Sequence, residues 1–216
     1  MTYDLEQYIL AHIDAEPPHL QQLYRDTHLQ LVYPHMCSGH LQGRLLKMLV
    51  RMVRPRRVLE LGTYSGYSAL CLAEGLPDDD CRVHTIEVND EMEQFIRRHL
   101  DASPVGHRVV LHIGDAADVL PTIGGTFDLA YVDANKRDYV ANYEQVLPRI
   151  SPGGFILVDN TLWGGKVTDG DANHDTLTQS IRAFNDHVAR DPRVEKVILP
   201  LRDGLTLIHV VDGEDH

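Results

Sequence analysis

Short hydrophobic runs alternate with longer amphipathic stretches through the middle of the chain. The runs are rich in Val, Ile, Leu and Phe, and the stretches between them repeat their apolar residues at helical spacing. Strands that alternate with helices of this length pair in parallel through right-handed crossovers. The pattern predicts a three-layer α/β domain with strands over residues 58–61, 83–87, 109–113, 127–132 and 154–158.

The N-terminal part departs from this rhythm. Apolar residues at helical spacing are interrupted at Pro17 and Pro18, which predicts two short helices. A third helix is expected from about Ser38, a suitable N-cap residue, to Pro55.

The C-terminal part is also different. A helix over 178–189 is followed by strands over 194–199 and 205–211, which are joined by a short turn. So short a connection forces antiparallel pairing, because a parallel return needs a crossover of a dozen or more residues. We therefore expect a mostly parallel sheet that ends in an antiparallel hairpin.

Composition and charge narrow the class of protein. The 216 residues, 43% hydrophobic and 24% charged, suit one globular domain. A net charge of −12 disfavours binding to a nucleic acid backbone through diffuse positive charge. The acidic N-terminus and the lack of a long apolar run predict a cytoplasmic, non-membrane protein, in which Cys37, Cys71 and Cys81 are free thiols.

The loop after the first strand is a candidate ligand site. It contains Gly62 and Gly66, and ligands of open α/β sheets bind at the carboxyl ends of strands. The dinucleotide fingerprint and the phosphate loop are both absent, while Glu87 ends the next strand, where a carboxylate can accept both hydroxyls of a ribose. A nucleoside without phosphates fits these features; the competing interpretation is a pair of turn glycines and a solvated Glu87.

Oxygen-bearing side chains follow two later strands. Asp133 comes directly after one strand, and Asp159 and Asn160 follow the next. If these strands are parallel neighbours, the three side chains emerge at one edge of the sheet, beside the glycine loop. An oxygen-only set suits Mg²⁺, with Ca²⁺ or Mn²⁺ as alternatives, and argues against zinc. Each residue alone is equally consistent with a structural turn.

Residues 58–70, Val-Leu-Glu-Leu-Gly-Thr-Tyr-Ser-Gly-Tyr-Ser-Ala-Leu, resemble the first motif of class I S-adenosylmethionine-dependent O-methyltransferases. Further motifs at 114–116, 133–136 and 159–163 follow in the family's order, and the chain looks like a bacterial member of the catechol and caffeoyl-CoA type. The resemblance implies a Rossmann-like methyltransferase fold with a seven-stranded sheet. It also implies a methyltransferase domain over 37–216, with N-terminal helices over 1–36 as an appendage.

The resemblance assigns roles residue by residue. Asp133, Asp159 and Asn160 would hold the metal, and Met36 and Trp163 would lie on the substrate side. The competing interpretations are simple packing for Met36 and a surface-loop anchor for Trp163. The cofactor-binding residues that it implies are Ser38, Glu60, Gly62, Thr63, Ser68, Glu87, Asp115, Ala116 and Asp133.

The implied reaction is an in-line methyl transfer from S-adenosylmethionine to a hydroxyl of a small catechol-like or hydroxycinnamoyl-type aromatic. The metal would chelate two vicinal oxygens, and Lys136, with Asp133 beside it, would accept the proton. Residues 164–175 are expected to form a loop over the site, and their acidic character disfavours a coenzyme A thioester. The family also suggests a homodimer.

Two alternatives remain open. A tRNA wobble-hydroxyuridine O-methyltransferase would need a local basic face beside the pocket. A non-catalytic S-adenosylmethionine-binding scaffold would have lost the chemistry that Asp133 and Lys136 provide. The basic residues that would have to form the tRNA-binding face are Arg44, Lys47, Arg51, Arg54, Arg56 and Arg57.

Overall fold

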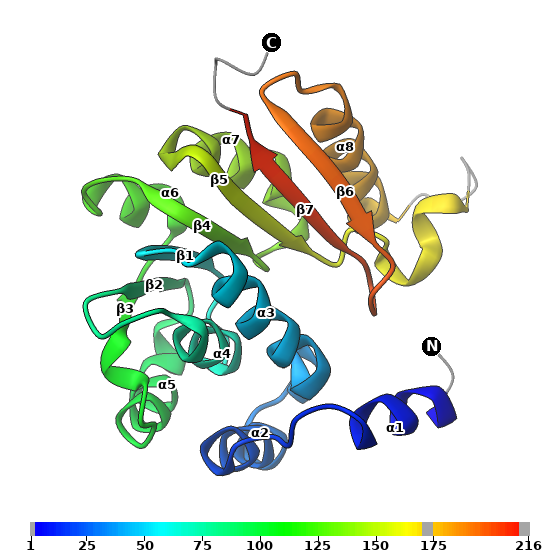
Figure 1. The fold of residues 1–216 in the computed structure, drawn as a ribbon. Coiled ribbons are helices and arrows are strands. Elements are labelled where there is room, and N and C mark those ends of the chain that lie inside the picture. The colour runs from blue at the N-terminus through cyan, green and yellow to red at the C-terminus, as the bar shows by residue number, and fades with distance from the viewer. Residues whose placement is uncertain (1–2, 170–174, 212–216) are drawn as a thin grey trace. The chain divides into compact units, whose positions relative to one another are not determined.

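The computed structural model describes residues 3–169 and 175–211, in which strands and helices alternate as the hydrophobic pattern predicts (Figure 1). The strands are β1 (Arg57–Leu61), β2 (Arg82–Glu87), β3 (Val109–Ile113), β4 (Phe127–Val132), β5 (Ile150–Asp159), β6 (Val194–Leu199) and β7 (Leu205–Val210). The helices include α1 (Tyr3–Ala11), α2 (Pro18–Gln30), α3 (Gly39–Val53), α4 (Tyr67–Gly75), α5 (Glu93–Asp101), α6 (Ala116–Val119), α7 (Tyr139–Val146) and α8 (Thr176–Arg190).

The strands form a seven-stranded sheet in the order β3-β2-β1-β4-β5-β7-β6. β1 pairs in parallel with β4, and β4 pairs in parallel with β5. β7 runs antiparallel to both β5 and β6. The predicted fold, a mostly parallel sheet with an antiparallel C-terminal hairpin, is confirmed.

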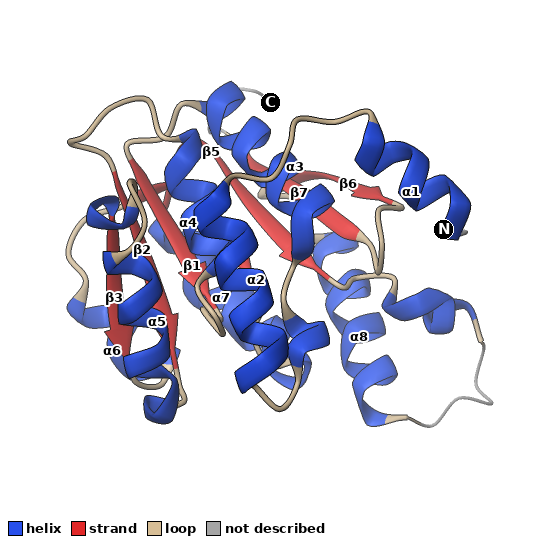
Figure 2. Cartoon of the chain, turned by 90° about the horizontal axis from the view of Figure 1, so that it is seen from below, coloured by secondary structure: helices blue, strands red, loops and turns tan. Residues whose placement is uncertain are grey.

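The chain divides into two compact units. The first comprises Met1–Arg56 and Thr63–Gly114, and the second comprises Arg57–Gly62 and Asp115–His216. In the first unit, β2 pairs in parallel with β3, and α2 lies beside α4 (Figure 2). Its core joins leucines of α2 to the buried face of α4 and to the apolar face of α5. The placement of a domain boundary between residues 36 and 37 stays a prediction.

In the second unit, α7 and α8 pack through aromatic side chains. The ring of Phe184 in α8 lies edge-on to Tyr139 and Tyr143 of α7, with centroid distances of 5.5 and 6.1 Å. Such edge-to-face pairs add to the stabilisation that burial alone gives. α8 also contacts β6, beside which it lies in Figure 1.

Histidines of the first unit make its stability sensitive to acid. Burial lowers the pKa of His19, His99 and His112 below the ordinary value of 6.5. Below pH 6.5 the unfolded chain therefore binds more protons than the folded chain. The contribution of these histidines to the free energy of unfolding is complete above pH 6.5 and decreases as the pH is lowered. We expect a lower melting temperature at about pH 5.5 than at about pH 7.5. Replacing His99 with Gln should reduce this difference in melting temperature between the two pH values, which thermal denaturation measures.

A matched control is His28→Gln, because His28 lies on the exposed side of α2. This variant should keep the full difference in melting temperature between the two pH values. Equal narrowing in both variants would contradict the assignment to buried imidazoles.

Candidate active site

In the first unit, the loop before α4 is fixed against the end of β2. The Thr63 hydroxyl lies 2.5 Å from the Thr85 hydroxyl, and both side chains are buried. The Tyr64 amide donates to Glu87 Oε2 at 2.7 Å. Gly66 precedes α4 with φ of +88°, a left-handed conformation that glycine adopts without strain. These contacts fix the predicted cofactor residue Thr63 in place, and Ser68 is buried in the first turn of α4.

Glu87 is the last residue of β2, as predicted, and it is nearly buried. Its Oε1 accepts the Asn89 amide at 2.9 Å, while Oε2 accepts that of Tyr64. Two backbone donors thus fix the plane of the carboxylate. Each oxygen has a second lone pair with which it can accept a further hydrogen bond, such as one from a ribose hydroxyl.

The segment before α3 corrects one expectation. Ser38 has φ −58° and ψ −34°, which is already helical, and its side chain makes no capping hydrogen bond. Ser38 does occupy the predicted N-cap position of α3, but it does not cap the helix, because a capping residue has extended backbone that directs its oxygen back to the helix amides. Ser38 is buried, whereas Met36 ends a short 3₁₀ turn and is half exposed.

In the second unit, Gly62 allows a close approach between two backbone segments. Its φ is +95°, and a Cβ at this position would lie 2.2 Å from the carbonyl oxygen of Asp133. The Asp133 amide also donates to the Leu61 carbonyl at 2.9 Å. The end of β1, with the fully buried Glu60, is therefore joined directly to the residue that follows β4.

Asp133 and Asp159 lie at neighbouring strand ends, as the conditional prediction required. Val132 of β4 is in register with Val158 of β5, so the two aspartates come next to each other. Burial raises the pKa of Asp133 to about 6; Lys136 opposes that rise and the charge of Asp159 adds to it. The Lys136 Nζ donates to Asp133 Oδ1 at 2.7 Å. The arrangement is a mostly buried acidic pair with one lysine.

Two tyrosines hold Asp159, and the sequence analysis missed both. The Tyr131 hydroxyl donates to Asp159 Oδ2 at 3.0 Å, and the Tyr139 hydroxyl donates to the Asp159 carbonyl at 2.9 Å. The Asn160 amide donates to Asp159 Oδ1 at 2.8 Å. The available signal was Tyr131 within a largely apolar strand, because a buried phenol needs a hydrogen-bond partner.

The chain after Asn160 rests on the turn between β6 and β7. The carbonyl of Asp203 accepts the amides of Leu162 at 2.7 Å and Trp163 at 3.1 Å. Trp163–Thr168 is a 3₁₀ segment interrupted at Gly164 and Gly165, so the expectation of a loop was wrong over these residues. Residues 170–174 of the predicted loop lie outside the described residues.

Asp115 and Ala116 stand at the start of α6. The Asp115 Oδ1 accepts the Ala117 amide at 2.8 Å, which caps the helix. This bond gives Asp115 a structural function. Its predicted place beside an adenine stays a prediction.

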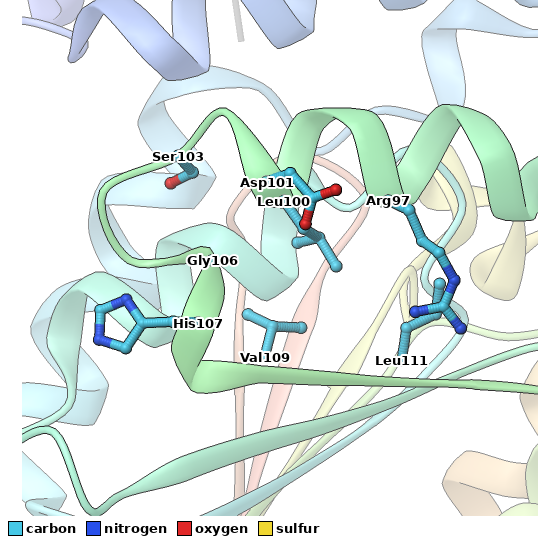
Figure 3. Close-up of a pocket in the computed structure, with 8 residues that line it drawn as sticks. All are labelled: Arg97, Leu100, Asp101, Ser103, Gly106, His107, Val109 and Leu111. Carbon is cyan, nitrogen blue, oxygen red and sulfur yellow. The ribbon is translucent and has the colours of Figure 1, made fainter.

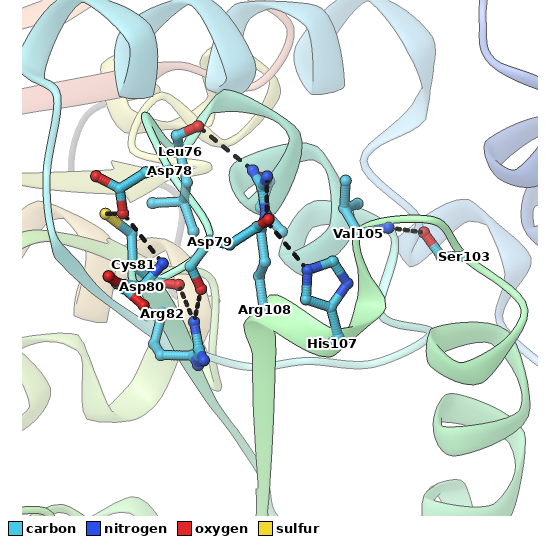
Figure 4. Close-up of polar contacts among 11 residues, drawn as sticks. Leu76, Asp78, Asp79, Asp80, Cys81, Arg82, Ser103, Val105, His107 and Arg108 are labelled. Carbon is cyan, nitrogen blue, oxygen red and sulfur yellow. Dashed lines mark hydrogen bonds and ion pairs between the residues drawn. The ribbon is translucent and has the colours of Figure 1, made fainter.

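A hollow of about 350 Å³ in the first unit shares no residue with the predicted site. Its charged lining includes Arg97 and His107 (Figure 3). Arg97 donates to Glu93, while His107 and Arg108 both contact Asp79 (Figure 4). Because Arg97 and His107 already pair with carboxylates, this hollow is a poor candidate for the chemistry. The other residues of the lining are Leu100, Asp101, Ser103, Gly106, Val109 and Leu111.

The family model described as O-methyltransferase matches residues 11–211. The chain belongs to this O-methyltransferase family. Its membership identifies the protein as an enzyme, and the resemblance inferred from the sequence motifs is confirmed.

Named relatives agree with this membership. The O-methyltransferase is 36% identical to catechol O-methyltransferase domain-containing protein 1 of Mus musculus, across 94% of this chain and 78% of that one. It is 32% identical to caffeoyl-CoA O-methyltransferase of Petroselinum crispum, across 94% and 89%. The crystal structure of an O-methyltransferase from Streptomyces achromogenes, involved in tomaymycin synthesis and in complex with SAM, matches with a TM-score of 0.89 and 32% identity, across 98% and 100%.

Basic residues that a tRNA-binding face would use are engaged inside the O-methyltransferase. In the first unit, Arg44 and Lys47 contact the carboxylate of Glu74 at 2.8 and 3.0 Å. In the second unit, Arg57 donates to the Thr126 carbonyl at 3.0 Å. The positive charges of Arg44 and Lys47 are therefore paired with the mostly buried carboxylate of Glu74. This pairing weakens the case that they bind a polyanion such as tRNA.

Two further expectations concern cysteine chemistry and membranes. The three cysteines of the O-methyltransferase are buried free thiols, as predicted. Among the described helices, none combines the length and apolar character that spanning a membrane requires.

Proposed function

We propose that the protein methylates a hydroxyl of a small catechol-like or hydroxycinnamoyl-type aromatic, with S-adenosylmethionine as methyl donor and a divalent cation as cofactor. The observation that carries the proposal is the mostly buried pair Asp133 and Asp159, with Lys136 beside them, at two adjacent strand ends. The names of the caffeoyl-CoA relatives support the acceptor class. The SAM and SAH complexes among similar structures support the donor.

The cofactor-binding roles are proposed residue by residue. In the first unit, Glu87 would accept the ribose hydroxyls, with Thr63, Ser68 and Ser38 nearer the methionine portion. In the second unit, Glu60 and Gly62 would serve the methionine portion, and Asp115 and Ala116 would border the adenine. The carboxylate of Glu60 is fully buried, and its negative charge is complementary to an ammonium group.

The donor set of the second unit fits a divalent cation. Asp133, Asp159 and Asn160 offer only carboxylate and amide oxygens, which are hard ligands that suit Mg²⁺, with Ca²⁺ or Mn²⁺ as alternatives. The charge of Asp159 also helps to raise the pKa of Asp133, so two like charges meet where a cation would be stabilising. A bound cation would lower the pKa of a coordinated hydroxyl and fix its position.

Lys136 is the proposed general base. Its Nζ is held 2.7 Å from Asp133 Oδ1 and lies 5.6 Å from the centre of the Tyr139 ring, so the side chain has a defined position. In its neutral form the amine accepts the proton of the acceptor hydroxyl. As the oxygen forms its bond to the methyl group, the carbon–sulfur bond breaks, and the sulfonium becomes a neutral thioether.

The remaining roles are also proposals. Met36 and Trp163 would contact the acceptor, and the Asp203 carbonyl holds the backbone of Trp163 at 3.1 Å. We extend the proposal to a homodimer in which the N-terminal helices take part. The exposed Tyr3 and Leu5 of α1 support such a role.

A labelled-methyl assay tests the proposal as a whole. The purified protein is incubated with methyl-labelled S-adenosylmethionine and catechol, caffeate or undermodified tRNA, with and without EDTA. We expect label in the phenols, its loss in EDTA and its recovery with excess Mg²⁺. Full turnover in excess chelator would refute the metal, label in tRNA alone would favour the tRNA alternative, and binding without transfer would favour a scaffold.

Replacing Glu87 with Gln is expected to weaken cofactor binding. The change removes a carboxylate acceptor at the proposed ribose position, which corresponds to about 1–3 kcal/mol, or roughly a 5- to 150-fold higher Kd. Isothermal titration with S-adenosylmethionine measures it. The matched control is Glu91→Gln, an exposed carboxylate after the same strand that should leave the Kd unchanged. An unaltered Kd in the Glu87 variant would reject the ribose assignment.

A further inference from the structure

Tyr131 presents a hydroxyl group in the interior of the second unit. The residue lies in β4 and is fully buried. Its hydroxyl donates to Asp159 Oδ2 at 3.0 Å. A phenylalanine would fill the same space without a polar atom to satisfy, whereas the tyrosine adds a hydrogen bond to a carboxylate, a type that contributes more to stability than a hydrogen bond between neutral groups. The hydroxyl therefore acts on the Asp159 carboxylate as well as filling space.

We propose that Tyr131 is a positioning residue, which fixes the Asp159 carboxylate for a divalent cation. The inference rests on the proposed function, in which Asp159 is a metal ligand. A terminal carboxylate otherwise rotates broadly about its last bond. Here Tyr131 donates to one carboxylate oxygen, and the Asn160 amide donates to the other at 2.8 Å. Both oxygens are therefore held in a defined orientation, and a carboxylate oxygen can accept more than one partner.

The backbone of the same residue is held as well. The Tyr139 hydroxyl donates to the Asp159 carbonyl at 2.9 Å. Asp159 is also the last residue of β5, opposite Leu205 of β7. Three donors and a strand pairing thus act on one ligand residue. Partners that orient metal ligands in this way commonly contribute about 10- to 100-fold to metal affinity or activity.

The chain contains a matched comparison outside the proposed site. Tyr143 is also fully buried, and its hydroxyl donates to Asp191 Oδ2 at 2.9 Å. That carboxylate is further held by the guanidinium of Arg193, at 2.6 Å. Tyr143→Phe therefore removes the same type of hydrogen bond as Tyr131→Phe, from an aspartate that the proposed function does not use. Asp191 lies near Glu144 and His187, but Arg193 already pairs with both acidic residues of that cluster, Glu144 and Asp191.

The test measures Mn²⁺ binding to the full-length protein by titration calorimetry or by the EPR signal of free Mn²⁺. Tyr131→Phe should raise the Kd for Mn²⁺ about 10-fold or more, whereas Tyr143→Phe should leave it within about twofold of the parent protein. Both variants should keep the Kd for S-adenosylmethionine, which shows that they are folded. In turnover assays, Tyr131→Phe should have a higher KM for Mg²⁺ than the parent protein, and its kcat at saturating Mg²⁺ should equal the parent value.

The outcomes separate this inference from the proposed function. An unchanged Kd for Mn²⁺ in Tyr131→Phe, with normal binding by the parent, would overturn the positioning role alone. Equal weakening in Tyr131→Phe and Tyr143→Phe would also overturn it, because the effect would then be one of general stability. A parent protein that binds no Mn²⁺ would instead refute the metal in the proposed function.

Discussion

Replacing Lys136 with methionine is expected to lower kcat by about 10²- to 10⁴-fold, the usual contribution of a general base. Methionine keeps the length of the side chain but cannot accept a proton. The variant also loses the hydrogen bond to Asp133 Oδ1. Lys136 is not itself a proposed cofactor contact, and the backbone bond from Asp133 to Leu61 remains, so the Kd for S-adenosylmethionine should stay within about threefold, roughly 0.7 kcal/mol. Single-turnover methylation of catechol measures the chemical step directly.

The matched control is Lys196→Met. The Lys196 Nζ donates to the carbonyls of Asp191 and Val194, so this variant also removes a hydrogen-bonded ammonium group. Its kcat should remain at the parent value. Comparable loss in both variants would show that removal of any hydrogen-bonded lysine slows the enzyme, and the base assignment would fail.

Replacing Gly62 with alanine is expected to destabilise the protein strongly. The new Cβ would lie 2.2 Å from the carbonyl oxygen of Asp133, and no side-chain rotation relieves a contact with backbone. Overpacking of this kind costs about 1–3 kcal/mol, and the φ of +95° adds about 1–2 kcal/mol for a residue with a Cβ. The melting temperature should fall by about 10 °C for a chain of this length.

Gly165→Ala separates the two causes. Gly165 has a similar φ of +85°, but a Cβ there would have no atom within 4 Å. Its variant should therefore lose only the conformational part, about 1–2 kcal/mol, as measured by chemical denaturation. Equal loss at both positions would show that the approach of Gly62 to Asp133 has no energetic weight.

Much of the fold was predictable because the buried strands are continuous apolar runs bounded by turn residues. The start of β5 differs from the prediction, because the strand begins at Ile150 and not near residue 154. Pro152 and Gly153 have the composition of a turn, yet the structure keeps them in the strand. The pairing of β4 with β5 shifts register between Phe127 and Leu129, an irregularity that accommodates such residues.

The candidate site was predictable only in part. Asp133 and Asp159 could be found because they follow apolar runs, and chain position alone places them at strand ends. The bond from Tyr131 to Asp159 could not, because it depends on the register that sets Tyr131 opposite Leu157. Register is a property of the assembled sheet, so local sequence does not reveal which buried hydroxyl meets which carboxylate.

The Asp203 carbonyl connects the C-terminal hairpin to the proposed acceptor side, since it holds the amides of both Leu162 and Trp163. For enzyme engineering, substitutions in the turn between β6 and β7 are therefore expected to change acceptor preference through the position of Trp163. Gly204 has to be kept, because a Cβ there would lie 2.5 Å from the Leu162 side chain. Libraries confined to Leu201 and Asp203 would keep Arg202, whose charge lowers the pKa of Asp133.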